Sequence, residues 1–318
     1  MKVLLIGYGS IGKRHEEVLL SFHDIKSIDI VTKQILKNKQ TFVSLKDVNN
    51  LGSYDYFIIA SETNKHYEQL SYLENNTEGK IIFCEKPLFE TKKELTIKNN
   101  EVFIGYVLRF HPLLQKLKAF IKDERVISVN AKCGQYLPSW RPDTDYEDSY
   151  SAKKSEGGGV LLDLSHEIDY VQYLCGELKE LKSYQVKISD LEINSDDLTM
   201  IIGKSVNNSM ASVSIDYISK ITHRELFVDT NEHSYRLDFI LNELTKKDKK
   251  GLEEKFSCSN LERNQMFEEM HKDILKNRKE VCSYKEGLEV MKTISTIQEQ
   301  NRWVKYYVPY VQEVAQRV

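Results

Sequence analysis

Short apolar runs alternate with amphipathic stretches over roughly the first hundred residues of the chain. The apolar runs predict strands at Val3–Ile6, Ser27–Val31, Tyr54–Ala60, Lys80–Cys84 and Val102–Tyr106. The third run holds Tyr56, Phe57, Ile58, Ile59 and Ala60 without polar alternation, which is typical of a strand buried on both faces of a parallel sheet. This strand and helix order predicts an α/β fold with an N-terminal doubly wound parallel sheet.

The pattern changes after about residue 109. A predicted helix at Pro112–Lys122 and strand at Val126–Cys133 precede a polar aromatic loop, a glycine-rich turn and a long helix. Residues 184–239 then predict successive strands, and helices return at Asn264–Lys276 and Tyr284–Gln300. We expect a dinucleotide-binding domain over residues 1–108 and an α+β domain with a mostly antiparallel sheet over residues 109–318. The last two helices are candidates for packing back on the first domain.

The composition is that of an ordinary globular protein. The chain has 318 residues, 41% hydrophobic and 29% charged, and this length suggests two domains. A formal net charge of −3 provides no field that would attract nucleic acid or anionic lipid. The five cysteines form no CxxC pair, the eight histidines are scattered, and the N-terminal apolar run is short. We therefore expect a cytoplasmic protein with no metal site and no nucleic-acid or membrane partner.

A glycine triplet directly after the first strand indicates a dinucleotide site. In the segment Gly7-Tyr8-Gly9-Ser10-Ile11-Gly12, the glycines permit a tight turn, close approach of a pyrophosphate and close packing of helix on strand. Ser10 and Ile11 begin an amphipathic helix, whose N-terminus offers free N–H groups to phosphate. The bland alternative is a structural turn.

The end of the second strand favours NADP over NAD. In an NAD site, an acidic residue about 20 positions beyond the last glycine binds the ribose 2′-hydroxyl. Counting from Gly12 leads to Thr32, which Lys33 follows, so a hydroxyl and a cation stand where a 2′-phosphate would lie. Asp29 is near enough to keep NAD open.

Two further segments carry candidate chemistry. Lys86 follows Glu85 at the end of the fourth strand, where its charge can stabilise a developing alkoxide, although a surface lysine before a turn is equally compatible. Beyond three glycines at 157–159, a helix would place Asp163 and His166 on one face, so that the carboxylate raises the pKa of the imidazole. Such a histidine can exchange a proton with a hydroxyl. The alternative is a surface pair.

These segments together resemble the Gfo/Idh/MocA oxidoreductases, a family that includes glucose-fructose oxidoreductase and inositol dehydrogenase. The matching pieces, in family order, are Gly7–His15, Thr63–His66, Glu85–Pro87 and Gly157–Asp169. The resemblance extends to about residue 300. It implies a Rossmann domain followed by an α/β domain whose open antiparallel sheet often mediates dimers or tetramers, so we expect a homodimer or homotetramer.

The resemblance also implies residue roles. Lys86 corresponds to the catalytic-site lysine and His166 to the acid/base histidine, with Asp163 beside it. The predicted cofactor contacts add Ser61, Thr63, His66, Glu85 and Lys86 to the glycine turn, Thr32 and Lys33. Two departures are visible: the family more often spaces the helix Asp and His by four residues instead of three, and Glu62 stands where a proline is common.

The segments 105–112 and 135–142 resemble a subgroup associated with bacterial surface-sugar pathways. The second segment, an aromatic and basic loop, is the first candidate for substrate recognition. Arg109 and Arg141 would bind a carboxylate or phosphate, while three aromatic rings would stack on a sugar or base, namely Tyr136, Trp140 and Tyr146. An interdomain or oligomer interface rich in aromatic residues explains the same pattern equally well.

The main functional hypothesis is hydride transfer between a nicotinamide and a hydroxyl or keto carbon of a sugar, nucleotide-activated sugar or related polyol. His166 would move the proton and Lys86 would polarise the oxygen. The rival from another class is a non-catalytic regulator that senses dinucleotide on the same fold. Reduction of an acyclic imine or a tetrapyrrole on this fold is a third alternative.

Overall fold

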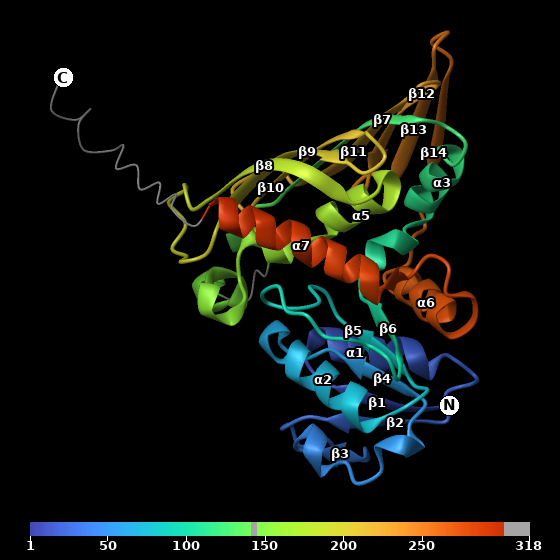
Figure 1. Cartoon of the computed structure of the whole chain (residues 1–318), viewed down its shortest axis with the longest axis vertical. Coiled ribbons are helices and arrows are strands. Elements are labelled where there is room, and N and C mark those ends of the chain that lie inside the picture. The colour runs from blue at the N-terminus through green and yellow to red at the C-terminus, as the bar shows by residue number, and fades with distance from the viewer. Residues whose placement is uncertain (141–144, 302–318) are drawn as a thin grey trace, which may run out of the picture.

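The computed structural model describes residues 1–140 and 145–301 and consists of two sheets with helices between and beside them (Figure 1). The segments 141–144 and 302–318 lie outside the described residues. None of the helices in the described part is long and apolar enough to cross a membrane.

The first sheet has seven strands in the order β15-β6-β5-β4-β1-β2-β3. Its strands are β1 Lys2–Ile6, β2 Ser27–Val31, β3 Thr41–Phe42, β4 Tyr56–Ile59, β5 Ile81–Cys84, β6 Glu101–Ile104 and β15 Cys282–Ser283. All pairings are parallel except that of β15 with β6. The helices α1 Ser10–Leu20 and α2 His66–Asn76 follow β1 and β4. This is the predicted Rossmann-type arrangement, to which β3 and the returning strand β15 are additions that the apolar pattern does not indicate.

The second sheet has eight strands in the order β14-β13-β12-β11-β7-β10-β9-β8. Its strands are β7 Val126–Gly134, β8 Leu178–Val186, β9 Leu198–Ser205, β10 Met210–Asp216, β11 His223–Thr230, β12 His233–Asp238, β13 Glu243–Asp248 and β14 Glu253–Ser257. Every pairing is antiparallel except that of β10 with β7. The predicted second, mostly antiparallel sheet is confirmed.

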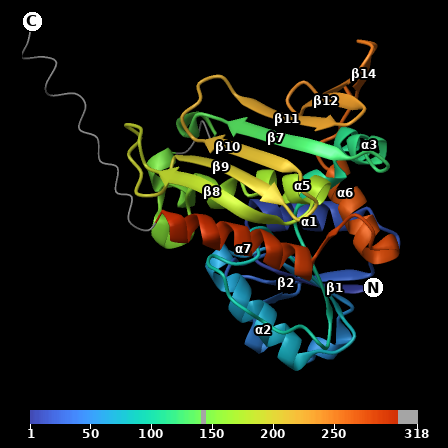
Figure 2. The same ribbon diagram turned by 45° about the horizontal axis from the view of Figure 1, so that its top comes forward.

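Helices cover only one face of this second sheet. They are α3 Pro112–Phe120, α5 His166–Cys175 and α7 Tyr284–Gln300. The helices α5 and α7 lie between the two sheets, whereas α3 lies at one end of the second sheet, against β12 and β13 (Figures 1 and 2). Strand residues alternate accordingly, with Val129, Ala131 and Cys133 of β7 buried on the helix side and Lys132 exposed. The opposite face carries no helix of the described chain (Figure 2).

The helix α6 Gln265–Lys272, continued by a π turn at Asp273–Asn277, returns to the first domain. It packs against α1, and its buried side chains join the apolar cluster on one face of the first sheet. That cluster includes Phe267, Met270 and Ile274. A segment from the far end of the chain therefore completes the N-terminal domain.

The prediction of one long helix after the glycines is wrong in one respect. The helix breaks at Leu164–Ser165 into α4 Val160–Asp163 and α5. Leu164 leaves helical geometry at φ −99° and ψ 31°. The Asp163 carboxylate beside the break accepts hydrogen bonds from the hydroxyls of Ser151 and Tyr217, both at 2.6 Å. These tertiary contacts hold α4 separately from α5, so helical periodicity does not extend across both.

Candidate active site

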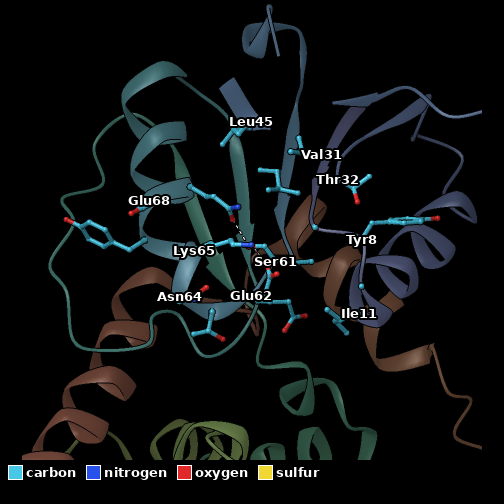
Figure 3. Close-up of a pocket in the computed structure, with 18 of the residues that line it drawn as sticks. Tyr8, Ile11, Val31, Thr32, Leu45, Ser61, Glu62, Asn64, Lys65 and Glu68 are labelled. Atoms are coloured by element: carbon cyan, nitrogen blue, oxygen red, sulfur yellow. Dashed lines mark hydrogen bonds and ion pairs between the residues drawn. The ribbon is translucent and has the colours of Figure 1, made fainter. Parts of the chain in front are cut away.

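A cleft of about 1640 Å³ opens along the carboxyl ends of β1, β4 and β5. In an open α/β sheet, ligands bind at this edge, where the strand order reverses. Figure 3 shows Tyr8 and Ile11 of the glycine turn on one side, and Asn64, Lys65 and Glu68 across from them. The far end of the cleft is lined by Lys86, Asp163 and His166.

The glycine turn provides a close backbone approach. Gly7 has φ +97°, in the region that favours glycine. A Cβ on Gly12 would lie 2.3 Å from the carbonyl oxygen of Gly7, whereas a Cβ on Gly9 would meet nothing within 4 Å. The helix α1 has no side-chain cap at Gly9 and no acidic residue in its first turn. Its N-terminus therefore presents backbone N–H groups and open space to an anion.

The residues at the end of β2 place a hydroxyl and a cation at the cleft. Thr32 and Lys33 line the cleft, together with Ser44 and Lys46 from the segment after β3. Asp29 is already engaged by other side chains. Its carboxylate accepts a hydrogen bond from the Tyr54 hydroxyl at 2.7 Å and pairs with Lys2 at 2.9 Å. It does not line the cleft.

Ser61 and Thr63 line the cleft after β4, but His66 does not. His66 is buried, with Nδ1 3.1 Å from the Pro87 carbonyl oxygen and Nε2 3.1 Å from that of Ser61. Burial lowers the pKa of this imidazole. As a direct cofactor contact the prediction for His66 is therefore corrected: the ring braces the loops that carry Ser61 and Lys86. Gly12 likewise lies beneath the lining, where it sets the packing of α1.

Glu85 and Lys86 stand at the end of β5 and both line the cleft. One carboxylate oxygen of Glu85 accepts from the Lys86 backbone N–H at 3.0 Å, and the other lies 2.9 Å from His15 Nε2. The Lys86 Nζ donates to the backbone carbonyl oxygen of Asp163 at 2.7 Å. This bond joins the two domains and directs the ammonium to the His166 end of the cleft.

His166 carries an unusual electrostatic environment. Its Nδ1 is buried without a hydrogen-bond partner among the described residues, and Tyr106 packs edge-on with ring centroids 5.6 Å apart. Burial, followed by the positive charges of Lys86 and Arg224, holds the pKa of His166 well below its usual value. The sequence-based expectation that Asp163 raises this pKa is wrong, because the carboxylate is taken up by Ser151 and Tyr217. Asp163 lines the cleft without forming the expected dyad.

Two family models match the chain. Residues 1–98 match the oxidoreductase family with an NAD-binding Rossmann fold, and residues 114–236 match the GFO/IDH/MocA C-terminal domain. The chain belongs to the Gfo/Idh/MocA oxidoreductase family. The sequence resemblance is thereby confirmed.

Individual relatives share only modest sequence identity with this chain. Levoglucosan dehydrogenase from Pseudarthrobacter phenanthrenivorans is 31% identical over 114 residues, which are 33% of this chain and 29% of that protein. The structure of a levoglucosan dehydrogenase in complex with NADH superposes with a TM-score of 0.82 at 19% identity, over 95% of this chain and 97% of that one. A super-repressor mutant of Gal80p from Saccharomyces cerevisiae reaches 0.81 at 15% identity, over 95% and 96%. At these identities the superpositions establish the fold alone.

In the described part of this Gfo/Idh/MocA chain, the predicted substrate residues do not gather in the cleft. Arg109 is 2% exposed and its guanidinium pairs with Asp169 at 2.7 Å and Glu286 at 2.8 Å. The assignment of Arg109 to a substrate anion is corrected, because two carboxylates already compensate its charge and bind it between α5 and α7. Arg141 lies outside the described residues.

The three aromatic residues of the loop also lie outside the cleft lining. The Trp140 ring packs edge-on against Tyr217 at 5.1 Å, and Tyr217 in turn binds Asp163. The Tyr146 hydroxyl accepts from the Glu192 backbone N–H at 3.1 Å, and Lys220 lies over the Tyr136 ring. Of the three, only Trp140 is linked to Asp163 by these contacts, through Tyr217.

Sequence reasoning missed several lining residues. Tyr150, Glu156 and Gly157 reach the cleft beside His166, and Phe267 of α6 reaches it from the far end of the chain. The three glycines at 157–159 were a usable signal for the first group. Phe267 had none, since an amphipathic helix in sequence does not reveal which domain it covers.

Proposed function

We propose that this chain is an NAD(P)-dependent oxidoreductase that transfers a hydride between a nicotinamide and a hydroxyl or keto carbon of a sugar, nucleotide-activated sugar or related polyol. The observation that carries the proposal is that Lys86 and His166 line the same cleft as the glycine turn. The similarity in sequence to levoglucosan dehydrogenase supports a sugar-type substrate.

The cofactor end of the cleft fits a dinucleotide. The uncapped N-terminus of α1 and the open space above Gly9 suit a pyrophosphate, with Ser10 and Ile11 at the first turn. Ser61, Thr63 and Glu85 would extend this contact toward the reacting end. A bound nicotinamide supplies the hydride or accepts it.

At the other end, the chain's own residues would manage the proton and the charge. His166 has a low pKa and is therefore neutral near pH 7, the form that accepts a proton from a substrate hydroxyl. With Nδ1 buried, Nε2 is the nitrogen available to the cleft. The Lys86 ammonium, held by the Asp163 carbonyl, would stabilise negative charge on the reacting oxygen.

For the cofactor we propose a preference for NADP. Thr32, Lys33 and Lys46 line the adenosine end, and Asp29, the nearest acid on β2, is engaged by Tyr54 and Lys2. Fluorescence titration should give tighter binding of NADPH than of NADH. Lys33→Ala should weaken NADPH binding by roughly 2- to 5-fold, because an exposed ion pair contributes little, while Lys37→Ala outside the cleft serves as the control. Tighter binding of NADH than of NADPH by the wild type would contradict the proposed preference for NADP.

We further propose a homodimer or homotetramer formed through the open face of the second sheet. Tyr184, Met200, Ile202 and Phe227 expose 62%, 49%, 63% and 41% of their surface there. Two of them are direct cross-strand neighbours, since Tyr184 of β8 lies opposite Met200 of β9. Light scattering of the wild type and of Ile202→Glu tests this interface, and an unchanged mass for the variant argues against it.

A substrate panel tests the activity itself. Sugars, nucleotide sugars, polyols, acyclic imines and tetrapyrroles are offered with NADP and NAD, and absorbance of the reduced nicotinamide is followed. Turnover of a sugar-type substrate is expected. Tight dinucleotide binding with no turnover of any panel member would instead favour the dinucleotide-sensing regulator.

A further inference from the structure

A continuous row of hydrogen bonds runs through the interior of the first domain. His15 Nε2 lies 2.9 Å from Glu85 Oε1, His15 Nδ1 lies 2.8 Å from His271 Nε2, and His271 Nδ1 lies 2.9 Å from the Tyr56 hydroxyl. His15, His271 and Tyr56 are completely buried. We call Tyr56, His271 and His15 the histidine chain. Its members come from α1, β4 and α6, so the return of α6 completes it.

The direction of these bonds follows from the carboxylate. An ionised Glu85 has no proton to donate, so His15 Nε2 must carry one. In a neutral His15, Nδ1 then accepts, which requires His271 Nε2 to donate and leaves His271 Nδ1 to accept from Tyr56. Burial, and then the neighbouring His15, hold the pKa of His271 well below its usual value, which keeps this ring neutral. All three donors therefore point toward Glu85, and aligned hydrogen bonds strengthen one another.

The histidine chain ends at Tyr56 inside the protein, and its other end meets Glu85 at the cleft. Tyr56 is 0% exposed, so the row offers no proton exit to solvent. At the other end, Glu85 lines the cleft and its second oxygen binds the backbone of Lys86. The arrangement is therefore suited to holding a charge in place.

We propose that the histidine chain is a positioning device that fixes the carboxylate of Glu85 at the Lys86 end of the cleft, so that the site distinguishes oxidised from reduced nicotinamide. The inference rests on the proposed function. The oxidised ring carries a positive charge and the reduced ring does not, so a fixed buried anion at this end favours the oxidised form. Because His271 lies on α6, the histidine chain makes this preference depend on the packing of α6 against the first domain.

The test measures dissociation constants for NADP⁺ and NADPH on the full-length protein. His271→Leu removes both ring nitrogens, and we expect the ratio of the oxidised to the reduced constant to rise roughly 5- to 100-fold, the effect of an unpaired buried group. Tyr56→Phe, which removes one oxygen, should shift the ratio in the same direction by less. His271→Gln keeps a donor and an acceptor and should recover most of the wild-type ratio.

Met270→Ala is the matched control, because it removes buried packing from the same helix without touching the chain. It should lower the melting temperature and leave the ratio unchanged. Equal ratios for wild type, His271→Leu and Tyr56→Phe would overturn the inference, as would a shift in Met270→Ala as large as that in His271→Leu. A wild type that binds no nicotinamide dinucleotide would instead overturn the proposed function. If His271→Leu does not fold, Tyr56→Phe decides the outcome.

Discussion

The two ends of the cleft are built in different ways. The dinucleotide end is made largely of backbone, from the consecutive residues 7–11 and the loop after β4. The His166 end is made of side chains from distant segments, with Lys86 on the first domain bound to Asp163 on the second. A short motif can encode the first, because glycines and a helix N-terminus act locally. The second depends on how the domains pack.

The largest expected effect separates the two ends. His166→Ala should lower turnover by roughly 10²–10⁴-fold, the usual loss for a general acid or base. Dinucleotide binding at the other end should remain near wild type, since the glycine turn and the helix N-terminus are expected to hold the pyrophosphate. Steady-state kinetics and fluorescence titration check both, with His23→Ala on the exposed surface as the control. Unchanged turnover would exclude His166 as the proton carrier.

Arg109 tests whether a buried ion pair supports the His166 end. Arg109→Met leaves Asp169 without its main partner, and we expect a loss of about 3–5 kcal/mol in the free energy of unfolding. Urea unfolding measures it. Lys65→Met removes the exposed pair with Glu62 and should cost at most about 1 kcal/mol. Equal losses in the two variants would contradict the scaffolding role.

Two glycines sharpen the account of the dinucleotide end. Gly12→Ala forces a methyl against the Gly7 carbonyl and should cost about 1–3 kcal/mol of stability. Gly9→Ala meets no protein atom, so its melting temperature should stay unchanged while dinucleotide binding weakens, because the methyl fills space meant for phosphate. Calorimetry and titration separate the two effects. If Gly9→Ala binds as tightly as wild type, the pyrophosphate does not approach this glycine.

A further effect concerns the pH dependence of stability. His66, His166 and His271 all have a lowered pKa in the folded chain because they are buried. The unfolded chain therefore binds more protons below the usual histidine pKa, and stability present above about pH 6.5 should fall as pH decreases, by up to about 1.4 kcal/mol per pH unit for each ring. Urea unfolding between pH 7.5 and 5.5 measures the slope. His66→Asn should reduce it, and a flat wild-type profile would count against neutral buried rings.

The activity profile offers a companion measurement at the His166 end. In the oxidation direction His166 must be neutral, and its low pKa should keep kcat/KM high to below pH 6.5. If kcat/KM already falls with decreasing pH at or above pH 6.5, the pKa of His166 is not lowered as its burial predicts.

Much of the fold follows from local pattern. Unbroken apolar runs specified β1, β4 and β5, and the helix predicted at Tyr284–Gln300 is α7 with the same bounds. Local pattern failed at β15, two residues long, and at the break between α4 and α5. Both are decided by partners elsewhere in the chain, namely β6 for β15 and Ser151 with Tyr217 for Asp163.

The sequence by itself determined the dinucleotide turn, the α/β character and the presence of Lys86 and His166, because these depend on neighbours within one strand, turn or helix. Only the tertiary structure decided what the buried polar and charged side chains do. Arg109 became a buried ion pair, His66 a brace, and His271 the partner of His15, 256 positions away. The reason is that the cost of burying a polar group is met by whichever partner the fold brings close, and sequence spacing does not record that distance.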